Sequence, residues 1–128
     1  MTRSGLIEYL ILSDVRTVGD DSSGRPTTWG ELRGIISQNA SKVGASPVEG
    51  PEMHDALERL DAGGHLSLDK WDTAAQCFRP YSDFGGDSVL FFKGQFRMRL
   101  TPEGRSYLER LETDIAPAPS PKSQKIGF

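Results

Sequence analysis

Apolar residues recur at helical spacing in the first part of the chain. Residues 4–17 carry a single apolar stripe, which predicts a helix with Ser4 as its N-cap. A second stripe follows Thr28, whose hydroxyl can accept from the first turn while Glu31, three residues later, reaches back. Between them, the glycines and aspartates of 19–24 interrupt the pattern. We therefore expect two helices joined by a loop.

A third helix is expected after a long connection at residues 40–50. Pro51 suits a first helical position because that position needs no N–H donor. Apolar residues then share one face of the helix, and Gly63-Gly64 can supply a left-handed ending. The outward face of this helix carries mainly charged side chains: Glu52, His54, Asp55, Glu58, Arg59 and Asp61.

The second half of the chain switches to strand periodicity. Alternating apolar and polar residues predict strands at 65–70 and 96–101. Between them, Asp72 is read as the N-cap of a short helix through Phe78. The apolar run 89–92 reads as a covered strand, and Gly94-Gln95 fits a two-residue hairpin turn with glycine first.

A last helix is expected from Pro102, with Thr101 as its cap. Its inner face would bear Leu108, Leu111 and Ile115, which suit either packing on the first helix or a homodimer interface. Prolines and small residues then alternate through 116–128, a composition that predicts a disordered tail.

Composition narrows the class of protein without identifying it. The chain has 128 residues, a net charge of −3 and one cysteine, Cys77, so no intrachain disulfide is possible. No apolar run approaches the length of a membrane span or the pattern of a signal peptide. These features favour one cytoplasmic domain, and any contact with DNA would need a local basic patch.

Two stretches carry a family resemblance. The run 56–66 resembles the recognition helix and first wing strand of winged helix-turn-helix proteins, and 96–108 resembles their second wing strand and closing helix. The pattern is similar to the MarR and PadR regulator families and to small phage-associated winged-helix proteins. The resemblance implies an α+β fold: a winged helix with a three-helix core, a small antiparallel wing and a C-terminal helix. It would span residues 1–115, with 71–88 inserted between the wing strands, where it could fold as a separate flap.

Charge divides this expected fold into two parts. From Val48 to Ala62 there are five acidic residues and one basic residue, on the helix that the resemblance would place in the major groove. From Phe91 to Leu111 there are five basic residues and two acidic ones. The first hypothesis is therefore a DNA-binding regulator, or a phage or defence accessory factor, that grips double-stranded DNA through a basic wing. Its contact residues would be Lys93, Arg97, Arg99, Arg59 and His54. The arginines could equally cover sheet surface and pair with local acids.

An alternative hypothesis uses the acidic face. A winged helix can serve as a protein-protein interaction module, an adaptor or inhibitor, and complementary potentials steer such encounters. The contact residues would then be Glu52, Asp55 and Glu58. An aromatic group around the insertion is expected to be mainly core, or else an exposed contact patch: Trp71, Phe78, Tyr81, Phe84, Phe91 and Phe92.

Catalytic and metal chemistry find little support in the sequence. Zinc would need about four ligands in tetrahedral arrangement, whereas the chain has two histidines and one cysteine at no recognised spacing. Cys77 has no base nearby in the sequence, and no phosphate-binding loop or nucleophile elbow occurs. We expect no enzyme activity, no metal and no cofactor.

Overall fold

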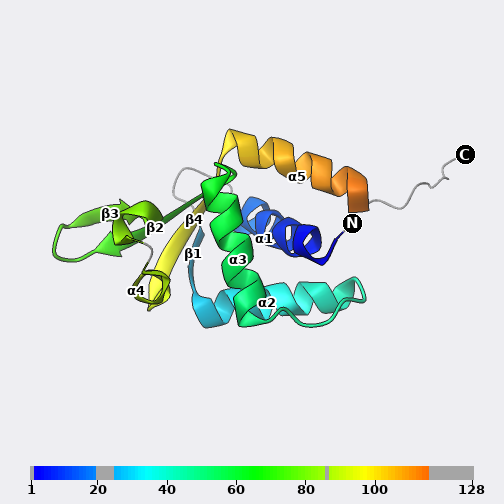
Figure 1. Cartoon of the computed structure of the whole chain (residues 1–128), viewed down its shortest axis with the longest axis horizontal. Coiled ribbons are helices and arrows are strands. Elements are labelled where there is room, and N and C mark those ends of the chain that lie inside the picture. The colour runs from blue at the N-terminus through cyan, green and yellow to red at the C-terminus, as the bar shows by residue number, and fades with distance from the viewer. Residues whose placement is uncertain (1, 20–24, 86, 116–128) are drawn as a thin grey trace, which may run out of the picture.

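Helices and strands alternate along the chain in the computed structural model, which describes residues 2–19, 25–85 and 87–115 (Figure 1). In chain order the elements are α1 Arg3–Gly19, β1 Arg25–Thr28, α2 Trp29–Lys42, α3 Gly50–Ala62, β2 Leu66–Asp72, β3 Cys77–Pro80, the 3-10 helix η1 Tyr81–Phe84, α4 Ser88–Phe92, β4 Gln95–Leu100 and α5 Pro102–Ile115.

The strands form one antiparallel sheet in the order β1-β4-β2-β3. Strand β4 is central: Met98 lies opposite Arg25 of β1 on one side and Leu68 of β2 on the other. The short strand β1 precedes α2 and α3 in the chain, and the other three strands of the sheet follow α3. This order makes the protein an α+β winged helix, as the sequence predicts.

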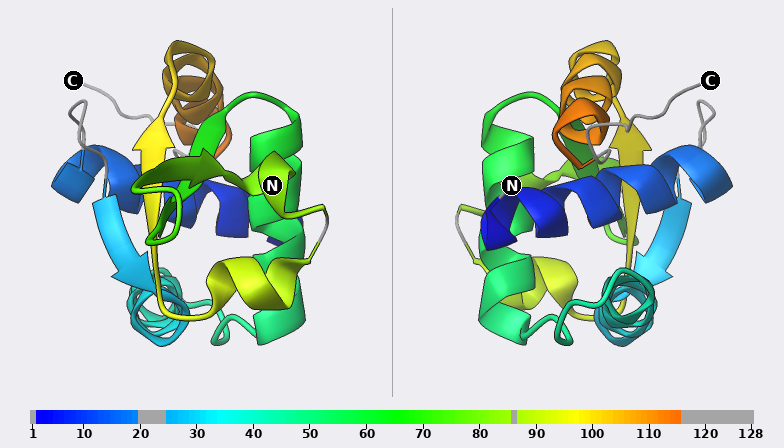
Figure 2. Two further views of the ribbon diagram at one scale, coloured as in Figure 1. Left: turned by 90° about the vertical axis from the view of Figure 1, so that its left-hand side faces the viewer. Right: turned by 90° about the vertical axis from the view of Figure 1, so that its right-hand side faces the viewer.

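The core lies where α1 meets the other helices and the inner face of the sheet (Figure 2). Helix α1 runs behind the sheet and packs against α2, α3 and α5. Ile11, Leu12 and Val15 on α1 are fully buried, as are Leu57 and Leu60 on α3. The apolar stripes seen in the sequence are therefore the faces that meet here. None of the described helices is long and apolar enough to cross a membrane.

Several predicted helix ends are confirmed. The capping box of Thr28 and Glu31 is formed at the start of α2. The hydroxyl of Thr101 accepts from the N–H of Gly104 in the first turn of α5. Gly64 adopts a left-handed φ of 75° just after α3. Helix α1, however, begins before Ser4, and its first turn donates to the hydroxyl of Thr2 instead.

The predicted helix from Asp72 to Phe78 is wrong. Residues 73–76 form a tight turn between β2 and β3, and Asp72 at the end of β2 pairs with Cys77 at the start of β3. The carboxylate of Asp72 accepts from the backbone N–H groups of Ala74 and Ala75. An aspartate makes the same hydrogen bonds at a helix N-cap, so its sequence signal fits both structures.

The predicted strand at 89–92 is also wrong. Residues Ser88–Phe92 form α4, with the side chain of Asp87 accepting from the N–H of Leu90. Gly94 has the expected positive φ, 76°, but it joins a helix to β4 and does not turn a hairpin. An apolar run this short does not distinguish a strand from a buried helical turn.

The segment 71–88 lies between the paired strands β2 and β4, as expected, but it is not a separate flap. It contributes β3 to the edge of the sheet, and η1 then packs beside β2 and β3. Tyr81, Phe91 and Phe92 are buried, whereas Trp71 and Phe78 remain about half exposed. The aromatic group is thus partly core and partly surface. The predicted tail, 116–128, lies outside the described residues.

Candidate interaction surface

The two wing arginines are joined to one buried carboxylate. Arg97 donates to both oxygens of Asp69, at 2.7 and 3.1 Å, and Arg99 donates to the second oxygen at 3.1 Å. Asp69 is 4% exposed, and strand pairing sets it directly opposite Arg97. Of the two readings of these arginines, pairing with a local acid is therefore the one the structure contains, and the single carboxylate offsets one of their two positive charges.

Two aromatic side chains, Phe78 and Trp71, lie next to Arg97 on the sheet. The guanidinium of Arg97 lies 3.7 Å from the ring centroid of Phe78, close enough for a cation–π contact. Phe78 in turn packs edge-on against Trp71, with 5.2 Å between the ring centroids. Arg97 is thus held by a carboxylate and a ring, and its side chain is only 18% exposed.

Arg59 of α3 is also paired with a carboxylate, although 44% of its side chain is exposed. Its Nε donates to the carboxylate of Glu8 on α1 at 2.8 Å, and Glu8 is buried. The Tyr107 hydroxyl donates to the other oxygen of Glu8. Burial, together with the hydrogen bond to Glu8, raises the pKa of Tyr107 to about 12. This network ties α1, α3 and α5 together and commits Arg59 to structure.

Lys93 is exposed just after α4, at the bend that leads into β4. Its backbone carbonyl accepts from the ammonium of Lys70, which also donates to the carbonyl of Phe91. Burial, with Lys93 nearby, lowers the pKa of Lys70. Of the predicted wing residues, Lys93 is the one whose described ammonium has no carboxylate within ion-pair distance.

The acidic face of α3 is present as expected, with three different environments. Glu52 forms two hydrogen bonds with Arg3, and this pairing, helped by the backbone N–H of Glu49, lowers the pKa of Glu52 to about 2. Asp55 is open to solvent, with 69% of its side chain exposed. Glu58 accepts from the hydroxyl of Tyr81 at 2.8 Å.

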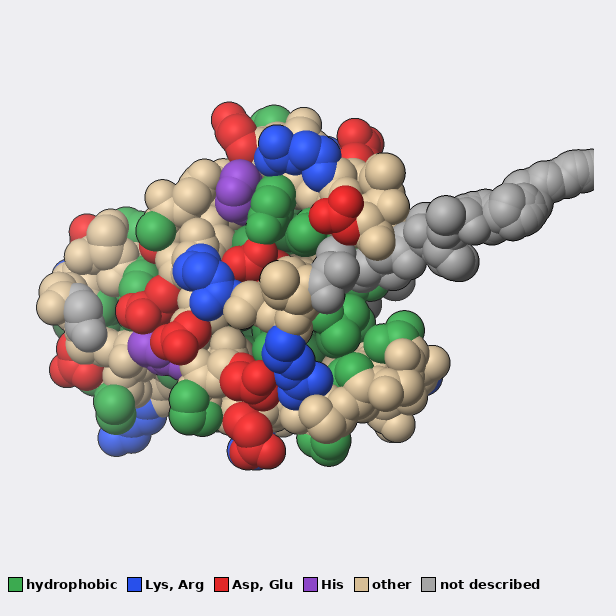
Figure 3. Space-filling view, turned by 45° about the vertical axis from the view of Figure 1, so that its right-hand side comes forward, with side chains coloured by type: hydrophobic (Ala, Val, Ile, Leu, Met, Phe, Trp, Pro, Cys, Tyr) green, Lys and Arg blue, Asp and Glu red, His purple; other side chains and the backbone are tan. Residues whose placement is uncertain are grey.

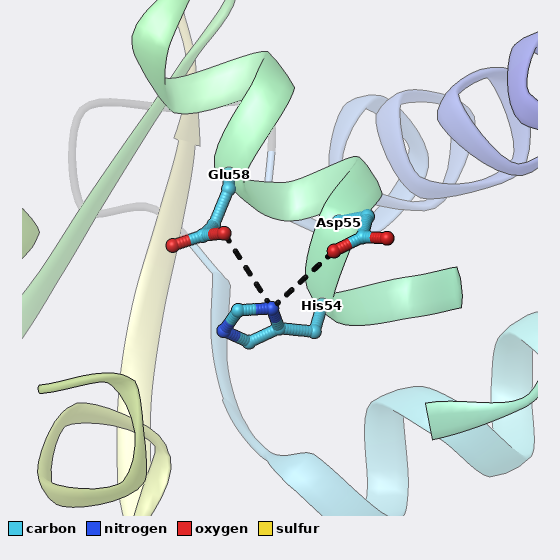
Figure 4. A group of neighbouring side chains, drawn as sticks. All are labelled: His54, Asp55 and Glu58. Carbon is cyan, nitrogen blue, oxygen red and sulfur yellow. Dashed lines mark ion pairs between the residues drawn. The ribbon is translucent and has the colours of Figure 1, made fainter. Parts of the chain in front are cut away.

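His54 lies beside two of these carboxylates. Its Nδ1 is 3.7 Å from Asp55 and 3.5 Å from Glu58, and all three side chains come from α3 (Figure 4). Their ligand atoms lie within 4.8 Å of one another. A zinc ion takes about four ligands, so this exposed trio would be incomplete as a structural zinc site. What the geometry shows directly is an imidazole between two carboxylates.

An apolar hollow adjoins this histidine. It has a volume of about 360 Å³ and is open to solvent. The start of α2, the middle of α3 and the segment around α4 line it: Trp29, His54, Ser88, Val89, Phe92 and Lys93. The rings of Trp29 and Phe92 pack together with centroids 4.8 Å apart and form its floor. Val89 is 80% exposed, and Leu90 beside it is 52% exposed.

Three further arginines in the described residues also pair with carboxylates of the same chain. Arg16 pairs with Glu112, Arg33 with Glu49, and Arg79 with Asp72. Figure 3 shows one face of the molecule, on which groups of acidic side chains lie beside most of the basic ones. Many basic side chains of the described surface therefore have a carboxylate beside them.

The closing helix α5 turns its leucines inward. Leu108 is fully buried and Leu111 is 6% exposed. Both belong to the core, where α5 packs on α1. Of the two expected uses of this face, packing within one chain is the one the structure contains.

Sequence reasoning missed three residues that shape this surface: Asp69, Glu8 and Val89. Asp69 reads as an ordinary polar residue of a strand, and only its register against β4 reveals the arginines. Glu8 interrupts an apolar stripe, which was the available signal that a buried partner existed. Val89 reads as a strand residue until α4 is seen.

No protein-family model and no curated protein matches this chain. Among solved structures, it is similar to a PadR-like transcription factor from Bacteroides fragilis. The similarity covers 88% of this chain and 82% of that chain, with a TM-score of 0.47 and 21% sequence identity.

Proposed function

We propose that this protein is a winged-helix module that binds a protein partner through the outward face of α3. One observation carries the proposal: the face that a DNA-binding winged helix would present is acidic, while the two wing arginines expected to grip phosphates share one buried carboxylate of the sheet. Asp55 and Glu58 stand on that face, and Asp69 holds both Arg97 and Arg99.

Electrostatics supports this choice. Affinity for duplex DNA comes largely from cations that neutralise phosphates. At physiological salt the Debye length is about 8 Å, so carboxylates on a helix lying in the groove would still repel the backbone. The same carboxylates favour encounter with a basic protein surface and reject like-charged ones.

The test compares capture of partners by the wild type and two charge variants. In Asp55→Lys the exposed side chain of the acidic face is reversed, while the pairs of Glu52 and Glu58 are kept. Glu109→Lys makes the same charge change on the exposed side of α5 and serves as the matched control. Quantitative mass spectrometry of captured proteins should show a partner that Asp55→Lys loses and Glu109→Lys keeps. If the captured sets are identical, the acidic face is not the contact.

A second candidate function is DNA binding, which the order of elements favours. Helices α2 and α3 followed by a β-hairpin form the arrangement used by winged-helix DNA-binding proteins. A regulator of this kind would make its contact through α3 and the β2–β3 wing, and Lys93 would be its accessible cation.

Fluorescence anisotropy with random duplex DNA separates the two candidates. At roughly 50 mM salt we expect no saturable binding, because backbone contacts require unpaired cations. Tight binding that weakens steeply with salt would establish the second candidate instead. In that case Lys93→Glu should reduce the salt slope by about one. Lys93 is preferred to Arg97 and Arg99 for this test because those two also hold the sheet.

A further inference from the structure

We infer that the hollow between α2, α3 and α4 takes an apolar side chain from a basic segment of the partner. The inference rests on the proposed function and adds the place and chemistry of the contact. The occupant is an amphipathic peptide segment with a leucine- or phenylalanine-sized anchor and Lys or Arg next to it.

The apolar part of this preference follows from the lining. Trp29 and Phe92 form an aromatic floor, and Val89 stands at the rim with most of its surface in water. Burying a leucine-sized side chain against such a surface is favourable because it removes apolar area from water. Concave sites lined by aromatic residues are also where binding hot spots concentrate.

The charged part follows from α3. Asp55 and Glu58 reach to within 3.7 Å of the imidazole that lines the hollow. The side of the hollow formed by α3 is therefore negative, whereas Lys93 stands on the α4 side. A basic residue beside the anchor would meet the carboxylates, and Lys93 would disfavour the reversed orientation.

His54 adds an independent sign that this surface is incomplete. Its Nε2 is buried and has no hydrogen-bond partner among the described residues. A buried polar atom left unpaired is destabilising, because its lost hydrogen bonds to water are not replaced. A small shift of the ring on binding would let this nitrogen pair with a polar group of the peptide.

The test uses Trp29 as a reporter within the full chain. The chain has two tryptophans, so Trp71→Phe leaves Trp29 as the one fluorophore of its kind. The probe is a synthetic amphipathic peptide with Leu and Phe on one face and Lys at the flanking positions. Control peptides carry Glu in place of each Lys, or Ser in place of Leu and Phe. Only the first should change Trp29 emission saturably.

Two valine variants then locate the contact. Val89→Glu places a charge at the rim of the hollow, at an exposed helical position that tolerates it, and should weaken peptide binding about tenfold or more. Val43→Glu changes another exposed valine, outside the hollow, and should leave binding unchanged. Asp55→Lys should weaken binding roughly 3- to 10-fold, and less so at high salt.

Other results overturn the inference in distinguishable ways. If Val89→Glu binds the peptide like the wild type, or the wild type does not bind it, the hollow is not this site. The capture experiment with Asp55→Lys would still decide the proposed function separately. Trp29 emission that responds to duplex DNA would assign the surface to DNA. Emission that depends on protein concentration, and loses that dependence in Val89→Glu, would assign it to a second copy of this chain.

Discussion

Arg97 and Asp69 face each other across β4 and β2, and two hydrogen bonds of 2.7 and 3.1 Å join their side chains. Charges this close within a sheet interact with each other more strongly than with a partner in solution. The pair explains why Arg97, which reads as part of a cationic ribbon in the sequence, presents little free charge in the structure.

Replacing Asp69 should destabilise the protein more than replacing Arg99. Asp69→Ala leaves the guanidinium of Arg97 at 18% exposure without its acceptor, which we expect to cost about 3 kcal/mol in the free energy of unfolding. Arg99→Met keeps the Arg97 pair intact and removes a side chain that is 40% exposed, so it should cost less than about 1 kcal/mol. Urea unfolding measures the free energy of unfolding of both variants. Equal losses of stability would show that the pair of Asp69 with Arg97 contributes no more than the pair with Arg99.

Gly104 should not tolerate a side chain. A Cβ at this position would lie 1.9 Å from the backbone oxygen of His65, so α5 would have to move away from the end of α3. We expect Gly104→Ala to lower the melting temperature markedly, with a cost of several kcal/mol. Gly34→Ala is the matched control, since no atom lies within 4 Å of a Cβ there.

The control variant Gly34→Ala should be more stable than the wild type. Gly34 is inside α2, and alanine is favoured over glycine in a helix by about 1 kcal/mol. A fall in melting temperature for Gly34→Ala, or none for Gly104→Ala, would contradict the packing seen at these two glycines.

Acidification should weaken the fold through Glu52. Its pKa is about 2 in the folded protein against an ordinary value of 4.5, because Arg3 donates to its carboxylate. A lowered folded pKa means that the contribution is complete above pH 4.5 and is lost as the pH falls toward 2. Asp72 and Glu112, whose pKa values are lowered by Arg79 and Arg16, act in the same direction.

The variant Glu52→Gln isolates this effect. Glutamine keeps an oxygen to accept from the N–H of Glu49 but does not titrate. The free energy of unfolding should therefore fall less steeply between pH 5 and 2.5 in Glu52→Gln than in the wild type. Parallel pH curves would show that the pair with Arg3 adds no stability in solution.

Two tyrosines should resist ionisation. Burial and hydrogen bonds to Glu58 and Glu8 raise the pKa of Tyr81 and of Tyr107 to about 12. The neutral phenols thus add stability that is complete below pH 10 and is lost as the pH rises toward 12. Ultraviolet difference absorbance should show both groups titrating late, and Tyr107→Phe should remove one of them. Titration of both near pH 10 while circular dichroism remains native would refute these contacts.

Local features of the sequence determined much of the architecture. The helices before residue 64, the strands β2 and β4 and the start of α5 follow from apolar periodicity and from caps such as Thr28 and Thr101. These signals act over a few residues, through hydrogen bonds and side-chain spacing that the neighbouring sequence contains. These signals predict an α+β chain, and the resemblance of 56–66 and 96–108 to winged helix-turn-helix proteins implies the arrangement.

Tertiary structure decided what the local signals left open. Asp72 could cap a helix or a turn, and the run at 89–92 could be a strand or a helix, because each choice satisfies the same local chemistry. Likewise, nothing near Arg97 in the chain reveals Asp69, which is 28 residues away. Pairing of β2 with β4 brings them together, and folding brings Trp29, His54 and Val89 around one hollow. Which charges stay free and which apolar side chains stay exposed is therefore a property of strand register and packing.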